Sequence, residues 1–164
     1  VYKRQKLEKP IVFDADALNM LASKQVNTAT LDASKYVITP HPGEAARLLS
    51  LSTDEIQDDR YAAAQQLHEM IGGVVVLKGS GTIIFDGDSL SVCPFGNPAM
   101  AVAGMGDVLT GVIASLIAQG MAINSAATEG VCLHAIAGDL AADADDRGML
   151  ASDVVETLRL ACNP

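Results

Sequence analysis

The sequence predicts an α/β protein in which helices cover both faces of a mostly parallel sheet. Two observations predict this fold: short apolar runs alternate with helical segments along the chain, and polar or glycine-rich loops follow several of those runs. The chain has 164 residues, of which 49% are hydrophobic, enough for one domain with a real core. We therefore expect residues 1–164 to form a single domain.

Strands are predicted where short apolar runs are bounded by glycine, proline or acidic residues. Runs that end in polar loops lie at 11–14, 36–40 and 74–81. Two more runs, at 82–86 and 89–94, flank Gly87 and predict a hairpin.

Helices are predicted where apolar residues recur at helical spacing. They are expected at 15–23, 43–49, 53–73, 105–119, 123–145 and 151–162. Ser52 or Thr53 caps the long helix over 53–73, and a glycine pair closes it. On that helix His68 is expected to be solvated, whereas His134 falls in an apolar helical stretch and is expected in the core or an interface.

The composition argues against a nucleic-acid-binding protein. The formal net charge is −9, and there is no Trp to stack on bases, so a phosphate polymer would be repelled. Cys93, Cys132 and Cys162 are widely spaced, as in a reduced, cytoplasmic protein. The apolar stretch at 108–122 is too short to span a bilayer, so no membrane association is expected.

The chain begins abruptly. It opens VYKRQKLEKP, without Met, and runs at once into the apolar residues 11–14. A domain rarely starts so close to a buried strand, so we expect a fragment in which residues 1–9 are candidates for a non-native segment.

The stretch GMGD places one carboxylate, Asp107, beside two glycines at the start of an apolar helix. Gly104 and Gly106 let the backbone approach a ligand closely, and the helix start attracts anions. In such a pocket Asp107 is better suited to take a proton from an attacking hydroxyl than to bind phosphate. The alternative is a helix-capping Asp after a glycine turn.

Other polar loops end the remaining predicted strands. Lys78 begins a glycine turn, KGSG, that could wrap a phosphate or adenosine; it lacks the P-loop spacing, and a simple hairpin turn is the alternative. His41 stands rigidly between two prolines and is a candidate ligand contact. Glu44 could bind Mg²⁺ or simply favour the helix start. Asp14 and Asp16 follow the first strand, and Asp16 could serve as a cap.

Four stretches together resemble a known family: DADALN, TPHPGEAARLL, VVVLKGSGT and GNPAMAVAGMGDVLTGVIASLIAQG. In this order they are similar to the ADP/ATP-dependent NAD(P)H-hydrate dehydratases, carbohydrate-kinase-like domains of the ribokinase-like superfamily. The similarity runs from Pro10 to Pro164. It implies a ribokinase-like three-layer sandwich whose N-terminal part is missing here, so that the chain would be the C-terminal portion of the domain.

The resemblance also implies an activity. Members of the family dehydrate (6S)-NAD(P)H hydrate back to NAD(P)H, a metabolite-repair reaction that consumes ADP or ATP with Mg²⁺. Phosphate is released together with AMP from ADP, or ADP from ATP. The family is often fused to an NAD(P)H-hydrate epimerase, and relatives form homo-oligomers such as tetramers.

Residue roles follow from the resemblance by position. Asp107 matches the catalytic aspartate, which also contacts the substrate, and His41 matches a substrate contact. Glu44 stands where related kinases carry a glutamate of a magnesium motif. The residues expected to bind the adenine nucleotide are Lys78, Gly79, Ser80, Gly81, Thr82 and Gly106.

Two positions depart from the family pattern, and two alternative functions stay open. Ala99 replaces the usual glycine, and Val102 replaces a Thr or Ser, which removes a hydroxyl near the anion pocket and is expected to reduce phosphate affinity. One alternative is an ordinary small-molecule kinase of the same superfamily. The other is a non-catalytic remnant that binds nucleotide or a partner.

Overall fold

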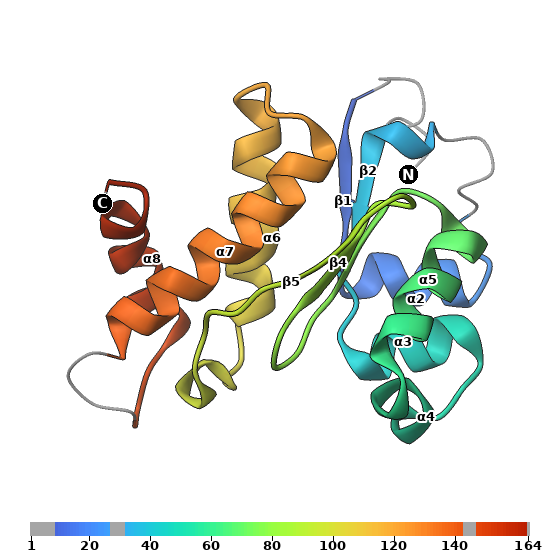
Figure 1. Ribbon diagram of the computed structural model, residues 1–164, viewed down its shortest axis with the longest axis horizontal. Helices are drawn as coiled ribbons and strands as arrows, with labels where there is room; N and C mark the ends of the chain where they lie inside the picture. Colours follow the sequence, from blue (N-terminus) through green and yellow to red (C-terminus); the bar gives the residue numbers. More distant parts are fainter. Residues whose placement is uncertain (1–8, 27–31, 143–146, 164) are drawn as a thin grey trace.

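A computed structural model of the protein describes residues 9–26, 32–142 and 147–163. In this part of the chain five strands form one sheet in the order β1–β2–β3–β4–β5. The parallel strands are β1 (Ile11–Phe13), β2 (Tyr36–Ile38) and β3 (Val74–Leu77). The antiparallel hairpin that follows consists of β4 (Ile83–Phe85) and β5 (Leu90–Val92). The predicted α/β fold and the predicted hairpin are both confirmed (Figure 1).

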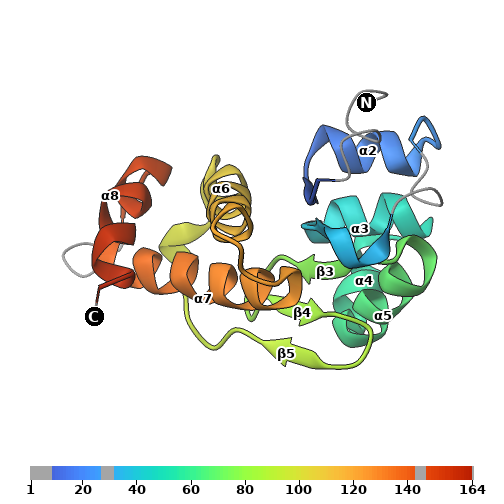
Figure 2. The same cartoon turned by 90° about the horizontal axis from the view of Figure 1, so that it is seen from above.

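Helices cover both faces of the sheet because successive side chains of a strand point to opposite sides. Tyr36 and Ile38 of β2 belong to one core, whereas Val37 between them belongs to the other. The first core is covered by α2 (Asp16–Ala22), α3 (Pro42–Leu49), α4 (Thr53–Asp58) and α5 (Arg60–Ile71). The second is covered by α6 (Met105–Ala118) and α7 (Ile123–Ala141) (Figure 2).

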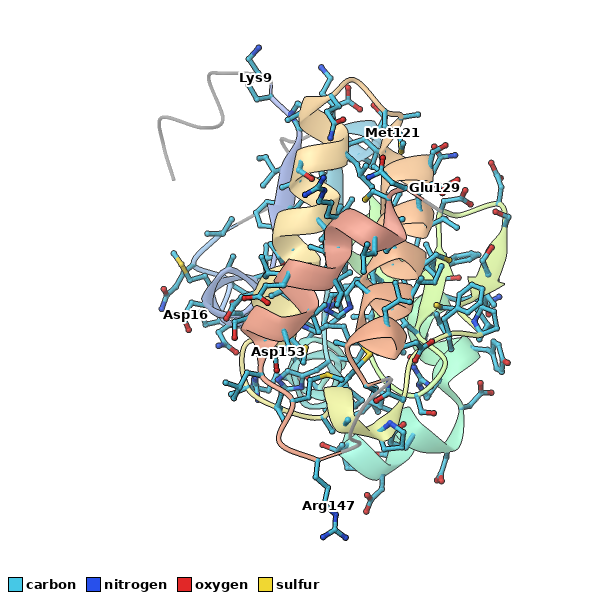
Figure 3. The ribbon with its side chains drawn as sticks, turned by 90° about the vertical axis from the view of Figure 1, so that its left-hand side faces the viewer. Lys9, Asp16, Met121, Glu129, Arg147 and Asp153 are labelled. Carbon is cyan, nitrogen blue, oxygen red and sulfur yellow. The ribbon has the colours of Figure 1, made fainter. Side chains whose placement is uncertain are left out.

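The last helix, α8 (Ala151–Ala161), lies outside these three layers and packs on α6 and α7. Its buried Val154 joins a third apolar cluster with Met105 and Ala137. Seen from the side of α8, the three helices stand together, with Met121 at the turn from α6 to α7 (Figure 3). No helix in the described ranges is long and apolar enough to cross a membrane.

The helix predicted over 53–73 is in fact two helices, α4 and α5, so this prediction is wrong. The chain breaks at Asp59, whose φ of −143° and ψ of 83° are not helical. The Asp59 carboxylate accepts a hydrogen bond from the Ala62 N–H at 2.9 Å and so caps α5. Ser52 caps α4, as predicted.

His68 is partly buried, not fully solvated as predicted. Its Nδ1 lies 2.7 Å from the carbonyl oxygen of Gly73, and its ring packs edge-on against Phe85 with centroids 5.2 Å apart. His134 is buried, as predicted. The described part of α7 ends at Ala141; residues 143–146 and most of the segment 1–9 that was expected to be non-native lie outside the described residues.

Gly73 provides a test of the packing between α5 and the sheet. Its φ is +71°, and a Cβ there would lie 2.4 Å from the Tyr36 ring and 2.7 Å from the Tyr36 carbonyl oxygen. We expect Gly73→Ala to lower the free energy of unfolding by about 2 kcal/mol or more, since it adds both strain and overlap. Urea unfolding measures the change.

Gly111 on α6 is the matched control because a Cβ there would meet nothing within 4 Å. Gly111→Ala should raise the free energy of unfolding by about 0.5–1 kcal/mol through helix propensity alone. Equal effects of the two substitutions would contradict the packing described for Gly73.

Candidate active site

The site lies where the parallel strands end, at the lower edge of the sheet in Figure 1. A cavity of about 440 Å³ opens there between the β3–β4 turn, the 3₁₀ helix η2 (Pro98–Met100) and the start of α6. Its volume is in the range of small-molecule sites, roughly 300–1,000 Å³. Every residue predicted to bind the nucleotide lines it: Lys78, Gly79, Ser80, Gly81, Thr82 and Gly106.

A buried ion pair organises the floor of this site. Lys78 Nζ donates to Asp14 Oδ1 at 2.8 Å, and the two side chains are 18% and 10% exposed. Thr110 of α6 donates to the other oxygen of Asp14 at 2.7 Å. Glu44 Oε2 lies 3.7 Å from the same Lys78 nitrogen. The pair therefore joins the ends of β1 and β3 to α6 beside the cavity.

These contacts control the charge of Asp14. Burial by itself would raise the pKa of this carboxyl, but the hydrogen bonds from Lys78 and Thr110 outweigh it and hold the pKa below its usual range. Asp14 is thus ionised at neutral pH. Lys78, which the sequence offers as a free cation for phosphate, is instead shared between two carboxylates.

Gly106 makes the close approach of α6 to this ion pair possible. A Cβ at Gly106 would lie 3.2 Å from Lys78 Nζ, so a larger residue would displace the lysine. Gly104 precedes the helix with φ +91° and offers no side-chain cap, which leaves the first N–H groups of α6 to bind a ligand. Asp107 is exposed in this first turn, next to Gly106 of the cavity wall.

His41 and Glu44 form a capping box at the start of α3. His41 Nδ1 accepts hydrogen bonds from the N–H groups of Gly43 and Glu44, and Glu44 Oε2 accepts from His41 N at 2.8 Å. His41 is exposed and Glu44 is buried, so of the two side chains only the imidazole is open to solvent. Neither residue lines the cavity.

The carboxylate of Glu44 is poorly placed to hold Mg²⁺ because its oxygens face the His41 N–H and Lys78. Within the described ranges, no group of three or more His, Cys, Asp or Glu side chains could hold a metal ion. The assignment of Glu44 as a metal contact stays a prediction.

The loop on the far side of the cavity is held by residues that the sequence did not single out. Asp139 of α7 accepts from the Gly96 N–H and from Asn97 Nδ2, each at 2.9 Å. The two departures from the family pattern, Ala99 and Val102, are neighbours of residues that line the cavity but do not line it themselves, and Val102 is 40% exposed. The structure gives no reason for Val102 to weaken phosphate binding.

The arrangement agrees with what a comparison of sequences finds. A sequence profile of the NAD(P)H-hydrate dehydratase family matches residues 2–160. The chain belongs to this family. The glycine loop after β3 and the GMGD turn both belong to the stretches that resemble this family.

Two relatives show how much of a family member the chain represents. It is 50% identical over 158 residues to the bifunctional NAD(P)H-hydrate repair enzyme Nnr of Vibrio cholerae, covering 96% of this chain and 31% of that protein. It is 39% identical to the ADP-dependent (S)-NAD(P)H-hydrate dehydratase of Neisseria meningitidis, covering 93% of this chain and 53% of that protein.

Solved structures share the fold. The ADP/ATP-dependent NAD(P)H-hydrate dehydratase of Bacillus subtilis, crystallised with ATP/Mg²⁺ and soaked with CoA, superposes with a TM-score of 0.81 at 29% identity. The match covers 93% of this chain and 55% of that one. A ribokinase-like superfamily protein of Enterococcus faecalis gives 0.77 at 28% identity over 93% of this chain and 52% of that one. The ribokinase-like fold is confirmed.

His134 of α7 forms part of the apolar wall of the cavity. It is 8% exposed, and its Nε2 is buried without a hydrogen-bond partner among the described residues. Burial lowers the pKa of His134 to about 4, against the smaller opposing effect of a hydrogen bond with the Met105 backbone. The ring is therefore neutral at pH 7.

This low pKa predicts a loss of stability in mild acid. Between the ordinary pKa of 6.5 and about 4, the unfolded chain binds a proton that the folded protein excludes. The free energy of unfolding should thus fall as the pH drops through this window, by about 2 kcal/mol from pH 7 to pH 5 for this residue. His134→Leu should remove that part of the slope in urea unfolding at the two pH values. If the free energy of unfolding of the variant fell as much between pH 7 and pH 5 as that of the wild type, the role of His134 would be contradicted.

Proposed function

We propose that the protein containing this chain uses ADP or ATP to dehydrate (6S)-NAD(P)H hydrate to NAD(P)H, and so repairs a damaged cofactor. The observation that carries this proposal is that all residues predicted to hold the nucleotide line one cavity, with Asp107 beside it. The relatives from Neisseria and Bacillus are named for nucleotide-dependent activity on this substrate. Because the chain spans about half their length, the activity is proposed for the whole protein.

The first step is a phosphoryl transfer. Asp107 takes the proton from the hydroxyl on ring carbon 6 while that oxygen attacks the terminal phosphorus of the nucleotide. The bond from that phosphorus to the rest of the nucleotide breaks and leaves AMP from ADP, or ADP from ATP. The free N–H groups at the start of α6 are suited to stabilise charge on the phosphoryl oxygens.

The second step is an elimination that needs no strong acid. Hydroxide is a poor leaving group, and phosphate is a good one. The lone pair of the ring nitrogen expels phosphate from carbon 6, and a proton lost from the neighbouring ring carbon restores the dihydropyridine. Mg²⁺ accompanies the nucleotide in this proposal, as ATP/Mg²⁺ did in the crystals of the Bacillus relative.

The wider setting is proposed in the same way. The Vibrio relative is a bifunctional repair enzyme, which supports a second activity on the same polypeptide, an NAD(P)H-hydrate epimerase. Exposed Leu150, Val155 and Leu160 on and beside α8 support a homo-oligomer. We place the protein in the cytoplasm.

Asp107→Asn tests the assignment of the base. Loss of a general base should lower kcat by about 10²–10⁴-fold while leaving ADP binding intact. Recovery of the near-ultraviolet absorbance of NADH from its hydrate measures turnover, and calorimetry measures ADP binding. Asp54→Asn is the control, since Asp54 is also an exposed acid in the first turn of a helix, on α4. Wild-type turnover by Asp107→Asn would refute the role.

The products distinguish dehydratase from kinase. With ADP, we expect NADH, inorganic phosphate and AMP in equal amounts, because the phosphorylated intermediate collapses. A stable phosphate ester without NADH would instead indicate an ordinary kinase. Nucleotide binding without either product would indicate a non-catalytic remnant. Phosphate analysis and chromatography of the reaction mixture make the distinction.

A further inference from the structure

Arg60 holds the loop that follows β3 from the side away from the cavity. It is the first residue of α5, and its Nη1 donates to the Ser80 carbonyl at 2.5 Å. Its Nη2 donates to the Leu77 carbonyl at 3.2 Å. Because a guanidinium is planar and rigid, two such bonds fix both the place and the orientation of the loop. Arg60 itself does not line the cavity.

These bonds determine which polar groups the loop leaves free. The carbonyls of Leu77 and Ser80 are taken up by Arg60, and that of Gly79 accepts from the Thr82 hydroxyl at 3.1 Å. In the described part of the chain, the N–H groups of residues 79–81 form no hydrogen bond. A loop with satisfied carbonyls and free N–H donors is suited to bind an anion.

The charge of Arg60 further favours the binding of an anion by this loop. No carboxylate of the described residues lies within ion-pair distance of its guanidinium, and the adjacent Asp59 caps α5 instead. Burial lowers the pKa of Arg60, but an arginine stays protonated at neutral pH. An uncompensated positive charge therefore stands directly behind the loop, where it attracts phosphate on the other side.

Gly79 makes this close approach possible. Its φ is +150°, and a Cβ there would lie 2.9 Å from Arg60 Nη2. Any side chain at 79 would push the guanidinium away. The glycine and the arginine thus form one unit, although they belong to different elements.

We propose that Arg60 is a positioning residue for nucleotide binding: it orients the 77–80 backbone so that the loop presents free N–H donors, backed by a positive charge, to the phosphates of an adenine nucleotide. The inference rests on the proposed function, in which this loop holds ADP or ATP. It assigns a role in binding to a residue that does not line the cavity.

The test compares Arg60→Met, Arg60→Lys and wild type in the protein made from its complete gene. Met keeps the aliphatic length and loses both bonds, so the Kd and KM for ADP should rise about tenfold or more, with kcat changed less than about twofold. Lys keeps the positive charge but cannot make both hydrogen bonds as the planar guanidinium does, so the Kd and KM for ADP should rise by an intermediate amount. The KM for the hydrated cofactor should not change.

Arg47→Met is the matched control. Arg47 lies on α3, where its Nε donates to Asn19 Oδ1 of α2 at 2.9 Å and not to the loop after β3. It should leave the KM for ADP unchanged. If Arg60→Met does not fold, the Lys variant alone decides.

The outcomes separate this inference from the proposed function. Wild-type affinity for ADP in folded Arg60→Met, or in Arg60→Lys where Met fails to fold, would overturn the role of Arg60 only. A fall in the kcat of the same variant at an unchanged KM for ADP would also overturn the role of Arg60. Failure of the wild-type protein to bind ADP would overturn the proposed function and, with it, the inference.

Discussion

The ion pair between Lys78 and Asp14 is the contact on which the arrangement of the site depends. It joins the ends of β1 and β3, and through Thr110 it also fixes α6 against them. Because both side chains are largely buried, removing one of them would destabilise the site: without Asp14 the lysine would keep the more distant Glu44, and without Lys78 the carboxylate would lose its cation and keep the hydrogen bond from Thr110. A Cβ at Gly106 would lie 3.2 Å from Lys78 Nζ, so the glycine lets the start of α6 approach this ion pair closely.

Much of the fold could be predicted from local pattern alone. The apolar runs, the hairpin around Gly87 and the cap at Ser52 depend on neighbouring residues, and all of them are confirmed. The break at Asp59 was missed because the apolar periodicity continues across it, and only the capping geometry of the Asp reveals it. The partial burial of His68 was not predicted because its partners, Gly73 and Phe85, come from the turn after α5 and from β4.

The candidate site also has a part that could be predicted from the sequence and a part that could not. The glycine turns at 79–81 and 104–106 are recognisable from consecutive residues, so both could be predicted from the sequence. In the structure, residues 79–81 and Gly106 line one cavity, and Gly104 lies at its border. The contacts that hold those turns join residues far apart: Asp14 and Lys78 are 64 positions apart, and Asp14 and Thr110 are 96. No spacing rule connects such residues; only the sheet topology brings them together.

The break between α4 and α5 has a consequence for insertions and deletions. Asp59 caps α5 independently of α4, so a change of length within α4 would shift the buried Ile56 of that helix but leave the cap of α5 intact. One residue inserted just after Arg60 would instead rotate the Arg60 side chain by about 100° around the helix axis relative to the buried residues of α5. The start of α5 is thus expected to tolerate a change of length less well than the segment before Asp59.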